Sequence, residues 1–235
     1  TSSPCGGKIA TLRRNTLRTC SDALRTVAVD AMTFGWTTLP CNGAAGTCVA
    51  QPATANKLDT LGDRLMYRLV YRNRGGVDSL VVVQSVDPDG AGARSSAVRW
   101  YEIRNPFAAA PTLFQNATYD PGASGDRWMG SVAMDKNGNM LMGFSYADVS
   151  ANVFPSIAIA GRLRSDVRNT MRAQQIAWNG TGAQTGTLTR WGDYTTMQID
   201  PADDCTFWYI GQYLAANGTF NWQTRVVSHK FPGCN

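Results

Sequence analysis

The stretch Arg190-Trp191-Gly192-Asp193-Tyr194 is the third appearance of one short motif, and this repetition predicts the fold. The motif occurs earlier as Gly62-Asp63-Arg64 and as Gly125-Asp126-Arg127-Trp128. Its aspartates are 63 residues apart between the first two copies and 67 apart between the last two. A period of this length indicates that one supersecondary unit is repeated and stacked along the chain.

Segments with the pattern of β-strands follow each copy of the motif. Residues 64–71, 79–86 and 97–103 follow the first copy, and 140–146 lies after the second. No segment keeps the apolar period of a helix for three turns, and Gly, Pro, Asn and Asp interrupt the chain throughout. The sequence therefore predicts an all-β protein, with 13–30 and 163–175 left open between a short helix and a loop.

Each repeat is predicted to be an antiparallel meander of three or four strands. Such a unit cannot bury both of its faces alone, so it must stack on its neighbours, as the blades of a β-propeller do. A β-sandwich could also hold these meanders, but it gives no reason for the motif to return. The predicted organisation is a single propeller domain: 1–61 as a partial or divergent blade with a disulfide-pinned connection, then blades at 62–124, 125–189 and 190–235.

The length of the chain bears on how complete this propeller is. At about 65 residues per blade, 235 residues correspond to about 3.6 blades, whereas closed propellers have about four to eight. We therefore expect part of a larger propeller, completed by a second polypeptide, most simply another product of the same precursor. The alternative is a compact four-bladed closure in which residues 8–50 form a divergent blade.

Composition and charge exclude several classes of protein. Hydrophobic residues make up 43% and charged residues 17%, which excludes a disordered chain. The longest uncharged apolar run, residues 80–83, is too short for a membrane-spanning helix. The net charge of +5 comes from arginines spread singly through the strands, which favours structural Arg–Asp pairs over a polyanionic ligand and does not favour nucleic acid.

The cysteines indicate an oxidising compartment. Their even count, the absence of Cys-x-x-Cys and the single histidine, His229, favour disulfides over a zinc site. The protein is therefore expected to be secreted or extracellular, with the periplasm and the cell surface as variants of the same prediction. Pairing each cysteine with its neighbour in the sequence gives Cys5–Cys20, Cys41–Cys48 and Cys205–Cys234. Only the last pair is far enough from the other cysteines to be preferred, and the connectivity of the first four stays open.

Several blocks of the sequence resemble a group of secreted bacterial proteins with a sialidase-like β-propeller, mostly uncharacterised. The resemblance covers roughly residues 48–235 and matches the C-terminal part of those proteins. It implies the propeller fold and an extracellular location, and it brings no catalytic set. The blocks that carry it are Arg127-Trp-Met-Gly-Ser-Val-Ala-Met-Asp135, Pro155-Ser-Ile, Gly161-Arg162, Arg190-Trp-Gly-Asp-Tyr194 and Asp200-Pro-Ala-Asp-Asp-Cys-Thr-Phe-Trp-Tyr209.

The motif residues are the candidate ligand-binding residues, because the starts of inner propeller strands gather at one mouth. Aromatic rings stack on sugars, while Asp and Arg bind hydroxyl and carboxylate groups. The alternative role is structural, with each Asp–Arg pair locking one blade to the next. The candidates are Asp63, Arg64, Asp126, Arg127, Trp128, Arg190, Trp191, Asp193 and Tyr194.

Two functions follow from this reading. The first is an extracellular glycan- or protein-binding module, favoured because no unique nucleophile and base are visible. The second is a glycoside hydrolase or lyase that acts on acidic polysaccharide at the channel mouth, with an aspartate pair as acid and base. The sequence does not identify the catalytic residues of that second function.

A calcium ion is the single cofactor that the sequence raises. Asp135, Asn137 and Asn139 have the oxygen spacing of a calcium loop, with Gly138 for the bend. No glutamate completes the loop at its twelfth position, and Asx-Gly turns are the usual connection between strands. A hairpin turn without bound metal is therefore the favoured interpretation.

Overall fold

The computed structural model describes residues 10–13, 16–19, 25–28, 39–42, 47–89, 96–122 and 124–235, the first three ranges by strand pairing alone. Their regular structure is β-strand, apart from the short 3-10 turn η2 (Pro40–Asn42). The prediction of an all-β chain is thus confirmed for these residues. They include no helix that is long and apolar enough to cross a membrane.

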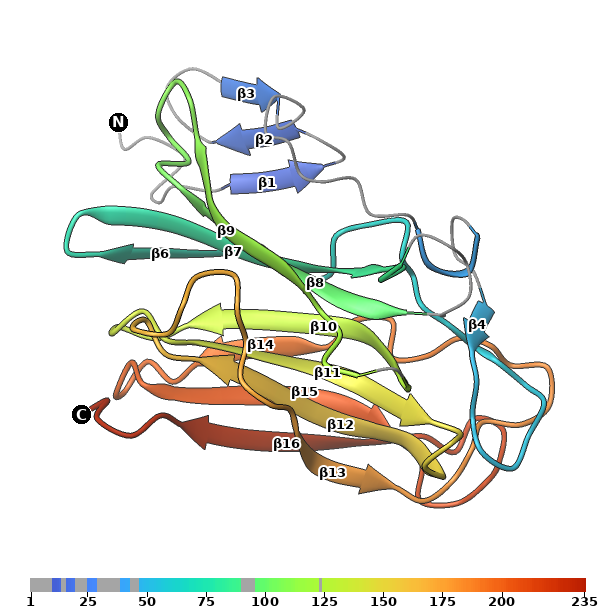
Figure 1. Ribbon diagram of the computed structural model, residues 1–235. Helices are drawn as coiled ribbons and strands as arrows, with labels where there is room; N and C mark the ends of the chain where they lie inside the picture. Colours follow the sequence, from blue (N-terminus) through green and yellow to red (C-terminus); the bar gives the residue numbers. More distant parts are fainter. Residues whose placement is uncertain are drawn as a thin grey trace, which may run out of the picture.

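The strands form antiparallel sheets that follow the chain in order (Figure 1). The N-terminal sheet is β1 (Ala10–Arg13), β2 (Thr16–Thr19) and β3 (Arg25–Ala28), followed by the pair β4 (Thr47–Val49) and β5 (Leu58–Asp59). The first large sheet is β6 (Val70–Arg74), β7 (Val77–Val86), β8 (Ala97–Arg104) and β9 (Thr112–Tyr119). The second is β10 (Asp126–Met134), β11 (Met140–Asp148), β12 (Val153–Arg162) and β13 (Gln175–Gly180). The third is β14 (Thr196–Ile199), β15 (Thr206–Tyr213) and β16 (Gln223–Lys230).

Each of the three large sheets is a meander of consecutive strands and lies within one predicted repeat. The structure corrects or refines the sequence-based expectation in three segments. Part of segment 13–30 is strand, as β2 and β3, whereas 163–174 holds no helix or strand. The predicted strand 64–71 is broken, because continuous pairing begins only at Val70.

The break in 64–71 is a bulge with a clear geometric origin. Leu65 forms a bridge with Gln84, and Val70 pairs with Val81. Four residues thus lie between Leu65 and Val70, opposite two between Val81 and Gln84. The two extra residues loop outward, which exposes Tyr67.

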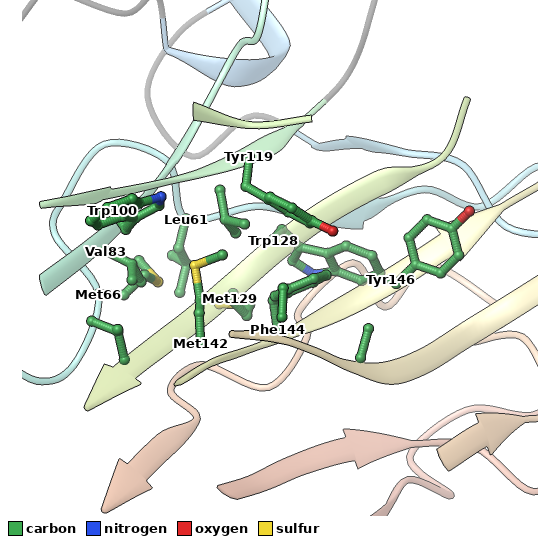
Figure 2. Packing of buried hydrophobic residues seen from close by; sticks show 14 of the residues in the cluster. Leu61, Met66, Val83, Trp100, Tyr119, Trp128, Met129, Met142, Phe144 and Tyr146 are labelled. Carbon is green, nitrogen blue, oxygen red and sulfur yellow. The ribbon is translucent and has the colours of Figure 1, made fainter. Parts of the chain in front are cut away.

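The large sheets stack face to face, and the second sheet is in the middle. Strand β10 lies against β7 on one side and against β14 on the other. The principal core fills the space between the first and second sheets, where one cluster contains Trp100 of β8 together with Trp128, Met142 and Phe144 of the second sheet (Figure 2). Because both of its faces are covered, β11 is buried along its whole length and reads as an almost continuous apolar run.

A second cluster joins the second and third sheets. Phe207 and Tyr209 alternate along β15 with Trp208, which points to the opposite, uncovered face. The Tyr209 ring packs directly over Gly143 of β11, where any Cβ atom would collide with it. Strict alternation on β15 shows that the third sheet is covered on one face only.

Two of the predicted disulfides are present in the structure. Cys205 and Cys234 have their Cα atoms 5.6 Å apart, and the bond ties the start of β15 to the segment after β16. Cys41 and Cys48, with Cα atoms 5.3 Å apart, join η2 to β4. The proposed Cys5–Cys20 pair lies outside the described residues.

Candidate functional site

The three motif copies lie at the same end of the stacked sheets. The Thr195 hydroxyl donates to the Met129 carbonyl at 2.8 Å, and the Met197 amide donates to the Ser131 hydroxyl at 2.9 Å, so β10 and β14 run side by side in one direction. On the other flank, the Met129 amide donates to the Ser85 hydroxyl at 3.3 Å. The starts of the three repeats therefore meet, as the sequence analysis expected of them.

The two tryptophans of the motifs lie in the core beneath this end. Trp128 and Trp191 are 0% and 1% exposed, with ring centroids 6.0 Å apart. The indole N–H of Trp191 donates to the Ser145 hydroxyl at 3.0 Å. Both rings are buried in the packing between the repeats, so neither is available for the stacking on sugars that the sequence suggested.

Arg127 is also internal. Its guanidinium donates to Gln174 at 2.8 Å and to Asp120 at 3.3 Å, and it lies 4.9 Å from the Tyr146 ring centroid. Only 3% of the residue is exposed. Arg127 therefore links the segment after β9 to the second sheet, which is a structural role.

Asp126 is a partly buried carboxylic acid. Its carboxyl accepts hydrogen bonds from the Ser96 amide at 3.1 Å and from the Ala50 amide. Burial raises the pKa of Asp126 to about 7, against the lowering effect of these amides and of Arg127. Asp126 thus connects the N-terminal segment and β8 to the second sheet, and it titrates near neutrality.

A buried carboxylate, Asp148, lies close enough to raise the pKa of Asp126 by charge repulsion. Burial alone would raise the pKa of Asp148. Hydrogen bonds from Ser150 at 2.6 Å and from the Ala151 amide at 3.1 Å outweigh burial and lower it. One neutral acid next to one ionised carboxylate is an arrangement that general acid–base enzymes use.

The solvent-facing part of the motif end consists of two ion pairs. Asp63 holds Arg64 through two hydrogen bonds of 2.8 Å, and Asp193 holds Arg190 in the same bidentate way. The side chains of Arg64 and Arg190 are 47% and 63% exposed. The paired carboxylates raise the pKa of both guanidiniums. Their bidentate hydrogen bonds fix the two positive charges in place.

Two exposed phenol rings complete this surface. The ring centroid of Tyr194 lies 6.4 Å from that of Tyr67, and Tyr194 adds to the effect of Asp63 in raising the pKa of Arg64. The two tyrosines are 52% and 48% exposed. Sequence reasoning missed Tyr67, because it occupies an ordinary position in a strand-like run and only the bulge turns it outward. We call the residues Asp63, Arg64, Tyr67, Arg190, Asp193 and Tyr194 the Arg–Tyr surface.

The N-terminal segment braces the loop that carries Arg190. Gln51 donates to the Gln184 carbonyl at 3.1 Å, and Asn56 donates to the Leu188 carbonyl at 2.8 Å. The Asp59 amide donates to the Thr189 carbonyl at 2.9 Å. These hydrogen bonds fix the position of the third motif copy.

The segment 135–139, which has the oxygen spacing of a calcium loop, is a hairpin turn between β10 and β11. Both oxygens of the buried Asp135 carboxylate accept hydrogen bonds from Asn139, one from its amide at 2.8 Å and one from its side chain at 2.7 Å. Gly138 adopts the positive φ of 87° that the turn requires. No cluster of three or more His, Cys, Asp or Glu residues suited to a metal occurs in the described part of the chain.

Comparison with known proteins adds no relative. No family model matches the chain, and no curated protein and no solved structure shows significant similarity to it.

Proposed function

We propose that this chain is an extracellular glycan-binding protein that holds an acidic sugar on the Arg–Tyr surface. The observation that carries the proposal is the exposed pair Tyr67 and Tyr194, with Tyr194 close to two anchored guanidiniums, Arg64 and Arg190. The two disulfides are compatible with the extracellular location.

The chemistry of these groups suits a uronate or a sialate. Phenol rings offer apolar faces to the C–H side of a pyranose ring and a hydroxyl to its edge. A guanidinium has more N–H donors than one carboxylate accepts, so Arg64 and Arg190 keep donors for a ligand carboxylate while they remain held by aspartate. Because the aspartates pre-order the arginines, less side-chain entropy is lost when the ligand binds.

We also propose that the stacked sheets are successive propeller blades. The adjacency of β10 with β7 and β14 supports this, and so does the single covered face of the third sheet. The uncovered face carries a shallow hollow of about 330 Å³ beside Trp208, Thr196 and Val226. A further blade, carried by a second polypeptide, would stack on this face.

Hydrolysis of an acidic polysaccharide is the second candidate, and Asp126 beside Asp148 is the observation in its favour. Asp126 is partly buried and accepts hydrogen bonds from the Ala50 and Ser96 amides, and Asp148 is 4% exposed. A substrate would therefore meet one partly buried and one buried carboxylate. The Arg–Tyr surface is open to solvent, and we therefore favour binding there.

An array of sialosides, uronides and neutral glycans tests the proposal. Binding should be confined to acidic glycans. Arg190→Ala should weaken it about 10- to 100-fold, which corresponds to the loss of charge-assisted hydrogen bonds. Arg172→Ala is the matched control, because Arg172 is also an exposed arginine held by an aspartate, Asp166, at 2.8 Å. Equal losses in both variants, or release of shortened sugars from the array, would contradict the proposal.

A further inference from the structure

Among the residues that the structure describes, the third sheet has one strand fewer than the other two large sheets. The first and second sheets contain four strands each, whereas the third ends at β16 after three. Strand β16 pairs with β15 over eight consecutive residues without a register shift. The outer strands β9 and β13 both pair with shifts. Among the described residues, β16 is thus a regular outer edge, of the kind that accepts another strand.

A tryptophan of the neighbouring sheet packs against the third sheet near this edge. The Trp178 ring of β13 has its centroid 5.7 Å from that of Tyr213 and 3.4 Å from the Arg225 guanidinium. It nevertheless remains 36% exposed.

We propose that β16 of a second copy of this chain occupies the fourth position, antiparallel to β16 and related to it by a two-fold axis at Val226. An isologous contact of this kind joins two identical edges and leaves neither open. The proposal concerns the edge of the sheet and goes beyond the glycan-binding function, because Val226 lies outside the Arg–Tyr surface.

Charge and backbone chemistry select this register among those that keep most of the strand paired. In an antiparallel pair, directly opposite residues point to the same face of the sheet. A two-fold axis between two identical strands must therefore pass through a residue and not between two residues. An axis at Arg225 would place two guanidiniums opposite each other, which is unfavourable. An axis at Val227 would place Trp222 opposite Pro232, which has no N–H to donate.

The axis at Val226 satisfies both conditions. It places Val226, 56% exposed in the single chain, against its own copy. It also places Trp222, 46% exposed, opposite Lys230, whose side chain is 42% exposed. A cation beside an aromatic ring is a favourable cross-strand pair. No charged residue then faces a like charge.

Cysteine cross-linking tests the proposed axis. Val226→Cys should form an intermolecular disulfide under mild oxidation, because opposite Cβ atoms in a sheet lie about 4.5–5.5 Å apart. Thr224→Cys is the control on the same face of the strand. Its two copies would lie four residues apart along the strand, about 13 Å, which is too far for a disulfide. Equal cross-linking of the two variants, or none in either, would overturn the proposal.

Sedimentation of the wild-type chain gives the independent measurement. It should show a concentration-dependent dimer, and Val226→Lys, which sets two like charges at the axis, should sediment as a monomer. Glycan binding by that variant at the wild-type level would show that it is folded. A wild-type chain that stays monomeric, or that pairs only with a different polypeptide, would overturn the proposal.

Discussion

The rings of Tyr67 and Tyr194 lie with their centroids 6.4 Å apart, although the two residues lie in the first and third repeats of the chain. This contact spans the end of the second repeat, whose own motif aromatic, Trp128, packs below on Trp191. The motif end therefore has two layers: an indole pair in the core and an exposed layer of arginine and tyrosine. The first layer accounts for stability, and the second is the proposed binding surface.

Replacement of Trp191 should disrupt folding rather than ligand contact. Trp191→Ala removes a fully buried indole and leaves the buried Ser145 hydroxyl without its donor. We expect a loss of about 3–5 kcal/mol in the free energy of unfolding, measured by urea denaturation. Tyr194→Ala, at an exposed position, should change that free energy little and reduce glycan binding. A stable Trp191→Ala variant that merely fails to bind glycan would contradict the two-layer description.

Asp126 should make the protein less stable as the pH rises toward neutrality. Its pKa is raised from 3.8 to about 7 in the folded state, so the folded chain holds a proton that the unfolded chain releases. The contribution of this proton to the free energy of unfolding is fully present below about pH 4 and is lost as the pH rises through about 7. The shift corresponds to about 4 kcal/mol at most.

Asp126→Asn isolates this effect, because the amide cannot ionise. The variant and the wild type should have similar unfolding free energies near pH 4 and diverge up to about pH 8, with the variant the more stable. Urea denaturation at a series of pH values measures the difference. Parallel pH profiles for the two proteins would show that Asp126 does not titrate as described.

The Cys205–Cys234 disulfide closes a loop with a sequence separation of 29 residues. Its removal in the double variant Cys205→Ser, Cys234→Ser should lower the free energy of unfolding by about 3–4 kcal/mol in the chain-entropy model. Thiol labelling of the native wild-type chain should leave both residues unmodified. Rapid labelling of either cysteine before denaturation would be incompatible with the bond.

The sheets and the last disulfide could be predicted because their signals are local. Runs such as 79–86 and 140–146 alternate or stay apolar over the full strand, and Asp135 and Gly138 mark the hairpin between β10 and β11. Cys205 and Cys234 are separated from the other cysteines by more than half of the chain. None of these features depends on how the sheets are placed relative to one another.

The composition of the Arg–Tyr surface could not be predicted, because it depends on packing between repeats. Trp128 and Tyr194 occupy similar places in their motifs, but Trp128 is covered by the neighbouring sheets and Tyr194 is not. Tyr67 reaches the surface only because two extra residues bulge between Leu65 and Val70. Nothing in the sequence of 64–71 marks that bulge.

Titration of the wild-type chain with oligogalacturonate and with a neutral oligosaccharide of the same length tests the central claim most directly. NMR observation of the tyrosine rings during the titration locates the site. We predict saturable binding of the acidic sugar, weakened by salt, with shifts at Tyr67 and Tyr194 and no comparable binding of the neutral sugar. Equal affinity for the two sugars, or binding that leaves both tyrosines unchanged, would contradict the assignment of the Arg–Tyr surface as an acidic-glycan site.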